Sequence, residues 1–199
     1  MKYFLGLDIS LTSTGVCVIN EKGKVCIITH ITSENIGNDV SGRMLRIKNV
    51  GKEVLAALGK NIIMCTAIEA YSFASKGKLA QLVEIGSHIR FKIYSFTPSV
   101  IIEPVPIQLK KFILGPQLMK KAKGKEAKTI IIREIYKKYC LDINNDDEAD
   151  AFILANIALL YYNIRNNVKS KHFTYQREVI EALIKKEDNE WKKRSKSKT

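Results

Sequence analysis

Acidic residues lie at one end of each of three predicted elements of this sequence, at positions where a carboxylate can do chemistry. Asp8 ends the apolar run that begins at Tyr3, and Glu69 comes near the end of the apolar run "NIIMCTAIEA". A third group, "NDDEADAFILA", places several acids at the start of a helical pattern. A carboxylate that is taken into a low-dielectric interior is costly to ionise unless something pairs with it. We therefore expect these acids to lie around a cation.

Asp150 differs from the other acids of the third group in its position within the predicted helix. Asp147 lies three residues before Asp150, so both project from one face of a helix, and Asp146 satisfies the same rule at four residues. Acids at a helix start also cap the helix and complement its dipole, which is our interpretation of Asp146 and Glu148. Asp150 is one turn further in and flanked by alanines, so capping explains it less well.

The acids converge if the first and fourth predicted strands are neighbours in one sheet. Asp8 and Glu69 then lie side by side, and the small residues after Asp150 let its helix approach them closely. Carboxylates placed in this way repel one another unless a cation lies between them. Hard oxygen ligands in this number suit Mg²⁺ or Mn²⁺ rather than zinc. The pattern predicts a divalent metal site.

The elements that must position these acids form a mixed α/β pattern. Hydrophobic periodicity and turn residues predict strands over residues 3–9, 15–20, 24–30, 61–70 and 99–105. Helices are predicted over 41–59, 79–95, 129–139 and 146–165, with one or two helical turns at 106–114 and a basic link at 115–128. Three antiparallel strands followed by strand–helix alternation predict an α/β protein with a mixed five-stranded sheet flanked by helices.

Charge is the most informative global property. The 199 residues include 33 Lys and Arg against 20 Asp and Glu, a net charge of +13. A basic domain of this kind most often binds nucleic acid. The alternative is a lysine-rich surface that serves solubility or reflects an AT-rich genome. No run approaches the roughly 18 apolar residues of a membrane span, and the N-terminus lacks a signal-peptide pattern, so we expect no membrane association.

The four cysteines favour a reducing compartment. Cys17, Cys26, Cys65 and Cys140 are scattered without a metal-binding spacing. Most of them lie in apolar runs, where cysteine behaves as a small hydrophobe. We therefore expect core cysteines and a cytoplasmic, intracellular protein.

The acids, taken in order, resemble a known family. Asp8 on the first strand, "IEA" with Glu69 on the fourth and "DEADA" from Asp147 on the last helix resemble the RuvC-type Holliday junction resolvases. The segments "PIQLKKFILG" and "AKTIIIREIY" resemble the family's basic segment and the helix after it. The resemblance implies an RNase H-like nuclease domain over 1–166, with 167–199 as a basic C-terminal extension, helical or partly disordered. "DISLTSTG" lacks the family's Pro-Gly after the first aspartate, a divergence expected of a phage version.

The resemblance also implies a two-metal nuclease. Its catalytic carboxylates would be Asp8, Glu69, Asp147 and Asp150, which would bind two Mg²⁺ ions, with Mn²⁺ able to substitute. Two ions about 3.5–4 Å apart activate a water and stabilise the leaving oxygen of a phosphodiester. Asp8 would bridge both ions, and Lys128 would act beside them at the DNA backbone.

Basic and aromatic side chains near the acids are candidates for DNA binding. By the same resemblance Lys110 and Lys128 approach the DNA backbone, whereas a wider phosphate-binding face would comprise Lys111, Lys121, Lys123 and Lys125. For an isolated lysine the alternative is a solvated surface charge. Tyr71 and Phe73 follow Glu69 on a predicted loop, where an aromatic ring can stack on an exposed base. Core packing is the alternative for both rings.

The expected function is that of a crossover junction endonuclease, which cuts a four-way DNA junction with paired symmetric nicks. The resemblance implies a homodimer, with residues 87–96 as part of the interface, and no nucleotide cofactor. One alternative is a nuclease with the same ligands that acts on forks, flaps or RNA. An actin-like ATPase or sugar kinase lobe, which "GLDISLTSTG" also resembles, normally needs about twice this length. A non-catalytic DNA-binding module would gain nothing from acids that repel DNA.

Overall fold

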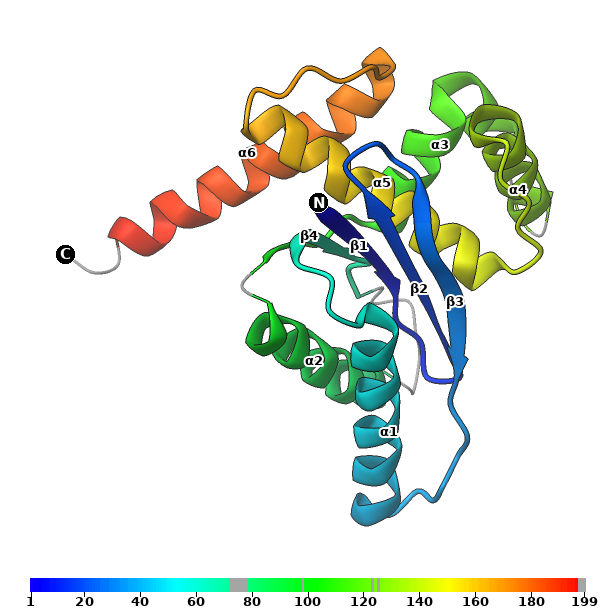
Figure 1. Ribbon diagram of the computed structural model, residues 1–199, viewed down its shortest axis with the longest axis vertical. Helices are drawn as coiled ribbons and strands as arrows, with labels where there is room; N and C mark the ends of the chain where they lie inside the picture. Colours follow the sequence, from blue (N-terminus) through cyan, green and yellow to red (C-terminus); the bar gives the residue numbers. More distant parts are fainter. Residues whose placement is uncertain (72–78, 98, 123, 125, 197–199) are drawn as a thin grey trace.

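The computed structural model describes residues 1–71, 79–97, 99–122, 124 and 126–196, and within these ranges five strands form one sheet (Figure 1). They are β1 (Tyr3–Asp8), β2 (Ser13–Asn20), β3 (Val25–Thr32), β4 (Ile63–Ile68) and β5 (Val100–Ile102). Their order is β3-β2-β1-β4-β5. β1 pairs antiparallel with β2 and parallel with β4, and β5 is parallel to β4. The predicted mixed five-stranded sheet is confirmed.

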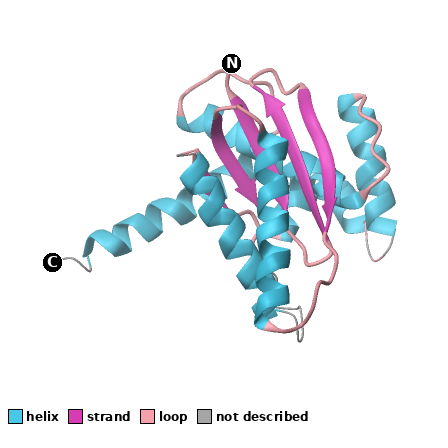
Figure 2. Ribbon diagram, turned by 60° about the horizontal axis from the view of Figure 1, so that its bottom comes forward, coloured by secondary structure: helices cyan, strands magenta, loops and turns pink. Residues whose placement is uncertain are grey.

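Helices cover both faces of the sheet (Figures 1 and 2). They are α1 (Val40–Leu58), α2 (Leu79–Phe96), α3 (Pro106–Lys121), α4 (Glu126–Tyr139), α5 (Asp146–Arg165) and α6 (Thr174–Lys196). α1 and α2 share one hydrophobic core with the sheet, and α5 shares the other with α3, α4 and α6. No helix in the described ranges combines the length and the apolar content that crossing a bilayer requires.

The alternation of side chains along β1 decides which face Asp8 occupies. Phe4 packs in the core on the α5 side, whereas Leu5 and Leu7 pack in the core formed with α1 and α2. Because successive side chains of a strand point to opposite faces, Asp8 lies on the same face as Phe4. The sequence of β1 therefore directs its terminal carboxylate toward α5.

Two glycines allow α5 to lie directly on the strands. A Cβ atom at Gly6 would overlap the carbonyl oxygen of Ala151, and one at Gly15 would overlap the carbonyl oxygen of Asp147. β1 and β2 thus present bare backbone to α5, which meets them with small residues such as Ala151 and Ala155. This close approach carries the start of α5 to the end of β1.

The segment after β5 differs from the prediction. One or two helical turns and then a basic link were expected, but α3 continues to Lys121 across a break at Gly115. Gly115 has φ 69° and ψ 173°, a left-handed conformation that favours glycine, and Pro116 follows it. A Gly-Pro pair normally ends a helix. Here the chain resumes helical geometry after the break and continues to Lys121, and α4 begins at Glu126, so most of the predicted link at 115–128 is helix.

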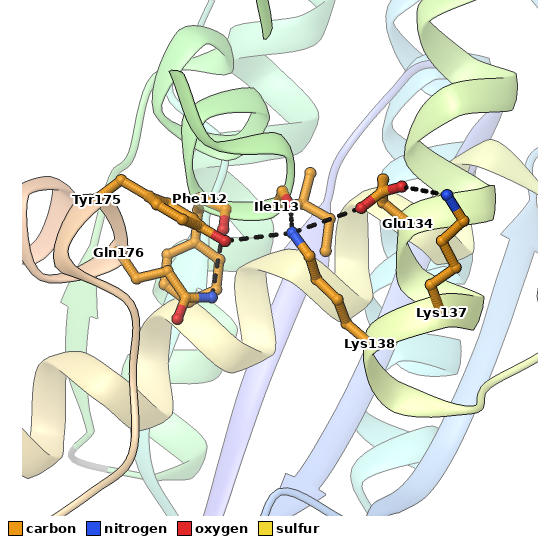
Figure 3. Close-up of polar contacts among 7 residues, drawn as sticks. All are labelled: Phe112, Ile113, Glu134, Lys137, Lys138, Tyr175 and Gln176. Atoms are coloured by element: carbon orange, nitrogen blue, oxygen red, sulfur yellow. Dashed lines mark hydrogen bonds and ion pairs between the residues drawn. The ribbon is translucent and has the colours of Figure 1, made fainter. Parts of the chain in front are cut away.

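Neighbouring helices cap the carbonyl groups that this break leaves free (Figure 3). Pro116 has no N–H, so the Phe112 carbonyl has no helical donor four residues on. The side-chain amide of Gln176, at the start of α6, donates to that carbonyl at 3.3 Å. The Lys138 ammonium of α4 donates to the next carbonyl, that of Ile113. The interruption of α3 is therefore stabilised from α4 and α6.

The C-terminal segment packs on the body through one face of α6. Val179, Ile180 and Leu183 are buried in the core shared with α5, and the rest of the helix extends away from the sheet (Figure 1). The expectation of a helical extension fits this arrangement, and the division of the chain at residue 166 stays a prediction. Of the cysteines, Cys17 and Cys65 are buried as expected, whereas Cys26 and Cys140 are exposed, so the expectation of core cysteines is wrong for these two.

Candidate metal centre

Three carboxylates from three different elements converge at one edge of the sheet. Asp8, Glu69 and Asp150 each offer an oxygen, and these oxygens lie within 4.8 Å of one another. Asp8 ends β1, Glu69 directly follows β4, and Asp150 lies near the start of α5. Parallel strands end at the same edge of a sheet, where sites form in α/β folds. The predicted convergence of these three acids is therefore present.

Hydrogen bonds to its backbone hold Glu69 beside β1, although β4 ends one residue earlier. Its N–H donates to the Leu7 carbonyl at 3.3 Å. Its carbonyl accepts from Nη2 of Arg90 on α2, also at 3.3 Å. The next N–H, that of Ala70, donates to the Pro104 carbonyl at 2.9 Å. The carboxylate of Glu69 thus projects from a fixed backbone.

Burial and mutual repulsion disfavour ionisation of this cluster. Desolvation, followed by the charges of Asp150, Glu69 and Asp147, raises the pKa of Asp8 to about 8. Desolvation and the charge of Asp150 raise the pKa of Glu69 to about 7. Desolvation is also the main cause that raises the pKa of Asp150 to about 6. Buried oxygen ligands whose charges repel in this way fit a divalent cation.

Two lysines lie on the open side of the carboxylates. Lys110 of α3 and Lys128 of α4 line a pocket of about 240 Å³ together with Glu69 and Asp150. The charge of Lys110 opposes the rise in the pKa of Glu69, and the charge of Lys128 opposes the rise for Asp8 and Asp150. The remaining wall is largely apolar, formed by Pro106, Leu109, Ala127, Ile131 and Ile132.

Asp147, the fourth predicted ligand, is close to the cluster but not part of it. The group of converging oxygens in the described residues comprises only Asp8, Glu69 and Asp150. Asp147 lies one turn before Asp150, and its charge contributes to the raised pKa of Asp8. Its role as a metal ligand stays a prediction.

The cap of α5 is Asn145, which the sequence analysis missed. Its side-chain oxygen accepts from the N–H groups of Asp147 and Glu148, at 2.8 and 3.2 Å. Asn is a preferred N-cap residue, so this signal was present in the sequence. Asp146 instead pairs with Lys128, and Glu148 pairs with His30 at 2.8 Å. Neither acid is the cap, so that part of the interpretation is wrong, but both lie in the first turn of α5, where their charges complement the helix dipole as expected.

The other candidate DNA-binding residues are dispersed. Lys111 pairs with Glu178 of α6 at 2.7 Å, so its ammonium group is directed toward α6. Lys121 is exposed at the end of α3. Lys123, Lys125 and Phe73 lie outside the described residues. The Tyr71 ring lies beneath the guanidinium of Arg90, 4.4 Å from its centroid, and is partly buried.

Arg46 and Arg90, which no sequence signal identified, hold the segments that carry the site. Arg46 of α1 donates to the Leu11 carbonyl and to Ser33. The Ser10 hydroxyl accepts from the Ser13 N–H at 3.0 Å in the same turn. The turn after Asp8 is therefore held by side-chain hydrogen bonds of Arg46 and Ser10.

Comparisons with known proteins identify the fold through structure alone. No protein-family model matches the chain, and a search of curated proteins finds no match. RuvC of Thermus thermophilus in complex with a Holliday junction substrate is similar, with a TM-score of 0.64 and 14% identity over 84% of this chain and 98% of that chain. A second T. thermophilus RuvC structure gives 0.63 and 16% identity over 83% and 97%.

A poxvirus protein is more distantly similar. The Fowlpox virus resolvase in complex with Holliday junction DNA gives a TM-score of 0.43 with 18% identity, over 78% of this chain and 96% of that chain. The RuvC structures define the class: the chain has the RNase H-like fold, as the sequence resemblance predicted.

Proposed function

We propose that this protein is a divalent-metal-dependent endodeoxyribonuclease that resolves four-way DNA junctions by hydrolysing phosphodiester bonds in paired symmetric nicks. The observation that carries the proposal is the convergence of Asp8, Glu69 and Asp150 within 4.8 Å. This cluster lies on a fold similar to a T. thermophilus RuvC that was solved with a Holliday junction substrate.

The carboxylates would hold the metal. Asp8, Glu69 and Asp150 are the direct candidates, and Asp147 is adjacent as the fourth ligand of a site for two Mg²⁺ ions, for which Mn²⁺ would substitute. Bound there, the ions supply an activated water and charge stabilisation for the leaving oxygen. Asp8 is the most central of these ligands because the charges of the other three all raise its pKa.

The lysines would position the scissile phosphate. Lys110 and Lys128 line the pocket beside Glu69 and Asp150, where an ammonium group can donate to a phosphate oxygen. Lys128 also pairs with Asp146, so a bound phosphate would compete with that carboxylate for it. Lys128 is 67% exposed in that pair, so its ammonium group is accessible to an incoming phosphate.

DNA binding would extend from this pocket over the basic surface. The net charge of +13 favours association with a phosphate backbone. The proposed contacts beyond the pocket are Lys111, Lys121, Lys123, Lys125, Tyr71 and Phe73. We expect Lys111 to contribute least because it is already paired with Glu178.

A homodimer would match the twofold symmetry of a four-way junction, with one active site for each cut. The second half of α2 is the proposed interface. Phe91 is 69% exposed and Tyr94 is 65% exposed, and large side chains of this kind are enriched at protein interfaces. Their exposure supports an apolar contact between two copies.

The test is Mg²⁺-dependent cleavage of a synthetic four-way junction, compared with a fork, a flap, a linear duplex and an RNA–DNA hybrid. We expect paired symmetric nicks in the junction, and no cleavage by Asp8→Asn. Asp142→Asn is the matched control, because Asp142 is an exposed acid. Equal cutting of forks and flaps would indicate a broader nuclease, and cleavage of the hybrid would indicate a ribonuclease. Binding without cleavage of any substrate would contradict the enzyme assignment.

A further inference from the structure

One guanidinium group on α2 connects the two chain segments that leave the sheet beside the carboxylates. Arg90 donates from Nη2 to the Glu69 carbonyl at 3.3 Å and from Nη1 to the Tyr71 hydroxyl at 2.8 Å. Its Nε donates to the Glu103 carboxylate, also at 2.8 Å. Glu69 and Tyr71 follow β4, and Glu103 follows β5. The side chain of Arg90 is only 17% exposed.

The packing around Arg90 is built for this arrangement. The guanidinium lies over the Tyr71 ring, 4.4 Å from its centroid. A Cβ atom at Gly86, one turn earlier on α2, would overlap the Tyr71 hydroxyl. The absence of a side chain at Gly86 therefore leaves room for the Tyr71 ring, which lies against the backbone of α2 and under the guanidinium of Arg90. A planar group with donors in a fixed fork suits these three acceptors, and a lysine ammonium does not.

We propose that Arg90 is a positioning residue for the Glu69 carboxylate. This inference rests on the proposed metal-dependent function of the same site. Glu69 is one residue beyond β4, so its own strand no longer fixes its carbonyl. The Ala70 N–H, which donates to the Pro104 carbonyl, already holds this peptide unit from one side. The Arg90 contact adds a direct restraint on the Glu69 carbonyl, and it couples Glu69 to the segment after β5 through Glu103. A metal ligand must be held to about 0.5 Å, which requires support of this kind.

Arg90 acts through geometry rather than through its charge. Its charge is matched by Glu103 in an ion pair at 2.8 Å. The cation whose charge acts on the Glu69 carboxylate is Lys110, which lines the pocket together with Glu69. A lysine at position 90 would keep the positive charge but could not donate to all three acceptors. Arg90→Lys therefore tests whether the three hydrogen bonds, rather than the charge, position Glu69.

The experiment measures Mn²⁺ affinity by titration calorimetry without DNA, and then junction binding and single-turnover cleavage, for Arg90→Lys. Residues that support metal ligands typically change metal affinity or activity by about 10–100-fold when replaced. We expect a loss of this size in Mn²⁺ affinity and cleavage rate, partly reversed by excess Mn²⁺. Junction affinity should stay within about twofold, since Arg90 donates to protein groups.

The matched control is Arg43→Lys. Arg43 of α1 donates to the Asn38 carbonyl and pairs with Glu84 at 3.3 Å, away from the carboxylates. This variant should behave as the unmodified protein does. Tyr71→Phe removes one acceptor of Arg90 but keeps the ring, so we expect a smaller loss in the same direction. It also serves as the test if Arg90→Lys fails to fold.

The outcomes separate this inference from the proposed function. Unchanged Mn²⁺ affinity and cleavage in Arg90→Lys, with an active unmodified protein, would overturn the role of Arg90 alone. A loss of Mn²⁺ affinity in Arg90→Lys, with no junction cleavage by the unmodified protein, would support Arg90 and reject the junction activity. An unmodified protein that binds no Mn²⁺ would overturn both.

Discussion

The carboxylate of Asp8, at the end of β1, lies within 4.8 Å of the carboxylate of Asp150, near the start of α5. The two residues are distant in sequence, and the contact between α5 and the strand backbone brings them together. Gly6 is central to that contact, because any side chain there would overlap the Ala151 carbonyl. The candidate metal centre therefore depends on a packing contact two residues from Asp8 on β1 and one residue from Asp150 on α5.

Gly6→Ala should damage both stability and metal binding. Overpacking of a well-packed interior costs about 1–3 kcal/mol, and each kcal/mol lowers the melting temperature of a chain this size by about 2–4 °C. We expect weaker Mn²⁺ binding as well, because displacement of α5 separates Asp150 from Asp8. Thermal melting and Mn²⁺ calorimetry measure the two effects. Normal values for both would show that α5 tolerates the methyl group.

The metal-free protein should lose stability as pH rises. The pKa of Asp8 is about 8 in the folded protein against an ordinary value of 3.8, so the folded state holds more protons than the unfolded chain in this window. Stability then falls as pH increases from about 4 to 8. Glu69, with a pKa of about 7, acts in the same direction. Melting temperatures in EDTA between pH 5 and 8 test this, and Mg²⁺ should restore stability at pH 8.

Asp8→Asn should flatten that pH dependence and raise the melting temperature of the metal-free protein at pH 8. The amide keeps the size of the side chain and removes the buried charge that its neighbours repel. The same variant should lose Mg²⁺-dependent stabilisation. Asp142→Asn, at an exposed position, should retain the slope of the unmodified protein. If Asp8→Asn destabilises the metal-free protein instead, the Asp8 carboxylate makes a favourable contact in the folded state that outweighs the repulsion from its neighbours.

The sequence predicts the sheet and three of the acids because both depend on local pattern. Alternation along β1 assigns Asp8 to one face, and the ends of parallel strands bring Glu69 to the same edge. On the last predicted helix, Asp150 is distinguished by its position one turn after the helix start, between two alanines. The small residues after Asp150 complete the prediction, because they indicate that this helix approaches the strands closely.

The remaining features depend on contacts between elements distant in sequence. Gly115-Pro116 is typical of a helix end, yet α3 resumes after it, and Gln176 of α6 and Lys138 of α4 donate to the carbonyls of Phe112 and Ile113 beside the break. Arg90 is one of many basic residues in the sequence, and only the packing of α2 directs it to Glu69. Sequence pattern carries no signal for either contact.

Lys128 and Lys111 should respond differently to removal of the side chain. Lys128 lines the pocket beside Asp150, so Lys128→Ala should lower the cleavage rate by about 10²-fold or more, as loss of a preorganised charge contact does. Junction affinity should fall much less. Lys111→Ala should change the rate little, because Lys111 is paired with Glu178. Single-turnover rates measure the effect on cleavage, and binding isotherms measure the effect on junction affinity. Equal rates for both variants would show that Lys128 is a solvated surface charge without a role in cleavage.

Gln176→Leu should destabilise the protein through the break in α3. The Gln176 side chain donates to the Phe112 carbonyl and accepts from the Phe173 N–H at 3.0 Å, and the residue is 6% exposed. A buried carbonyl that loses its donor costs about 1–3 kcal/mol. Urea unfolding should show a loss of that size.

Gln117→Leu is the control for this prediction, because Gln117 is an exposed glutamine on the second half of α3. It should change stability by less than about 0.5 kcal/mol. Because α3 also carries Lys110 in its first half, we expect Gln176→Leu to slow cleavage even where the protein remains folded. A destabilised Gln176→Leu variant with a normal cleavage rate would show that α6 stabilises the fold without positioning Lys110.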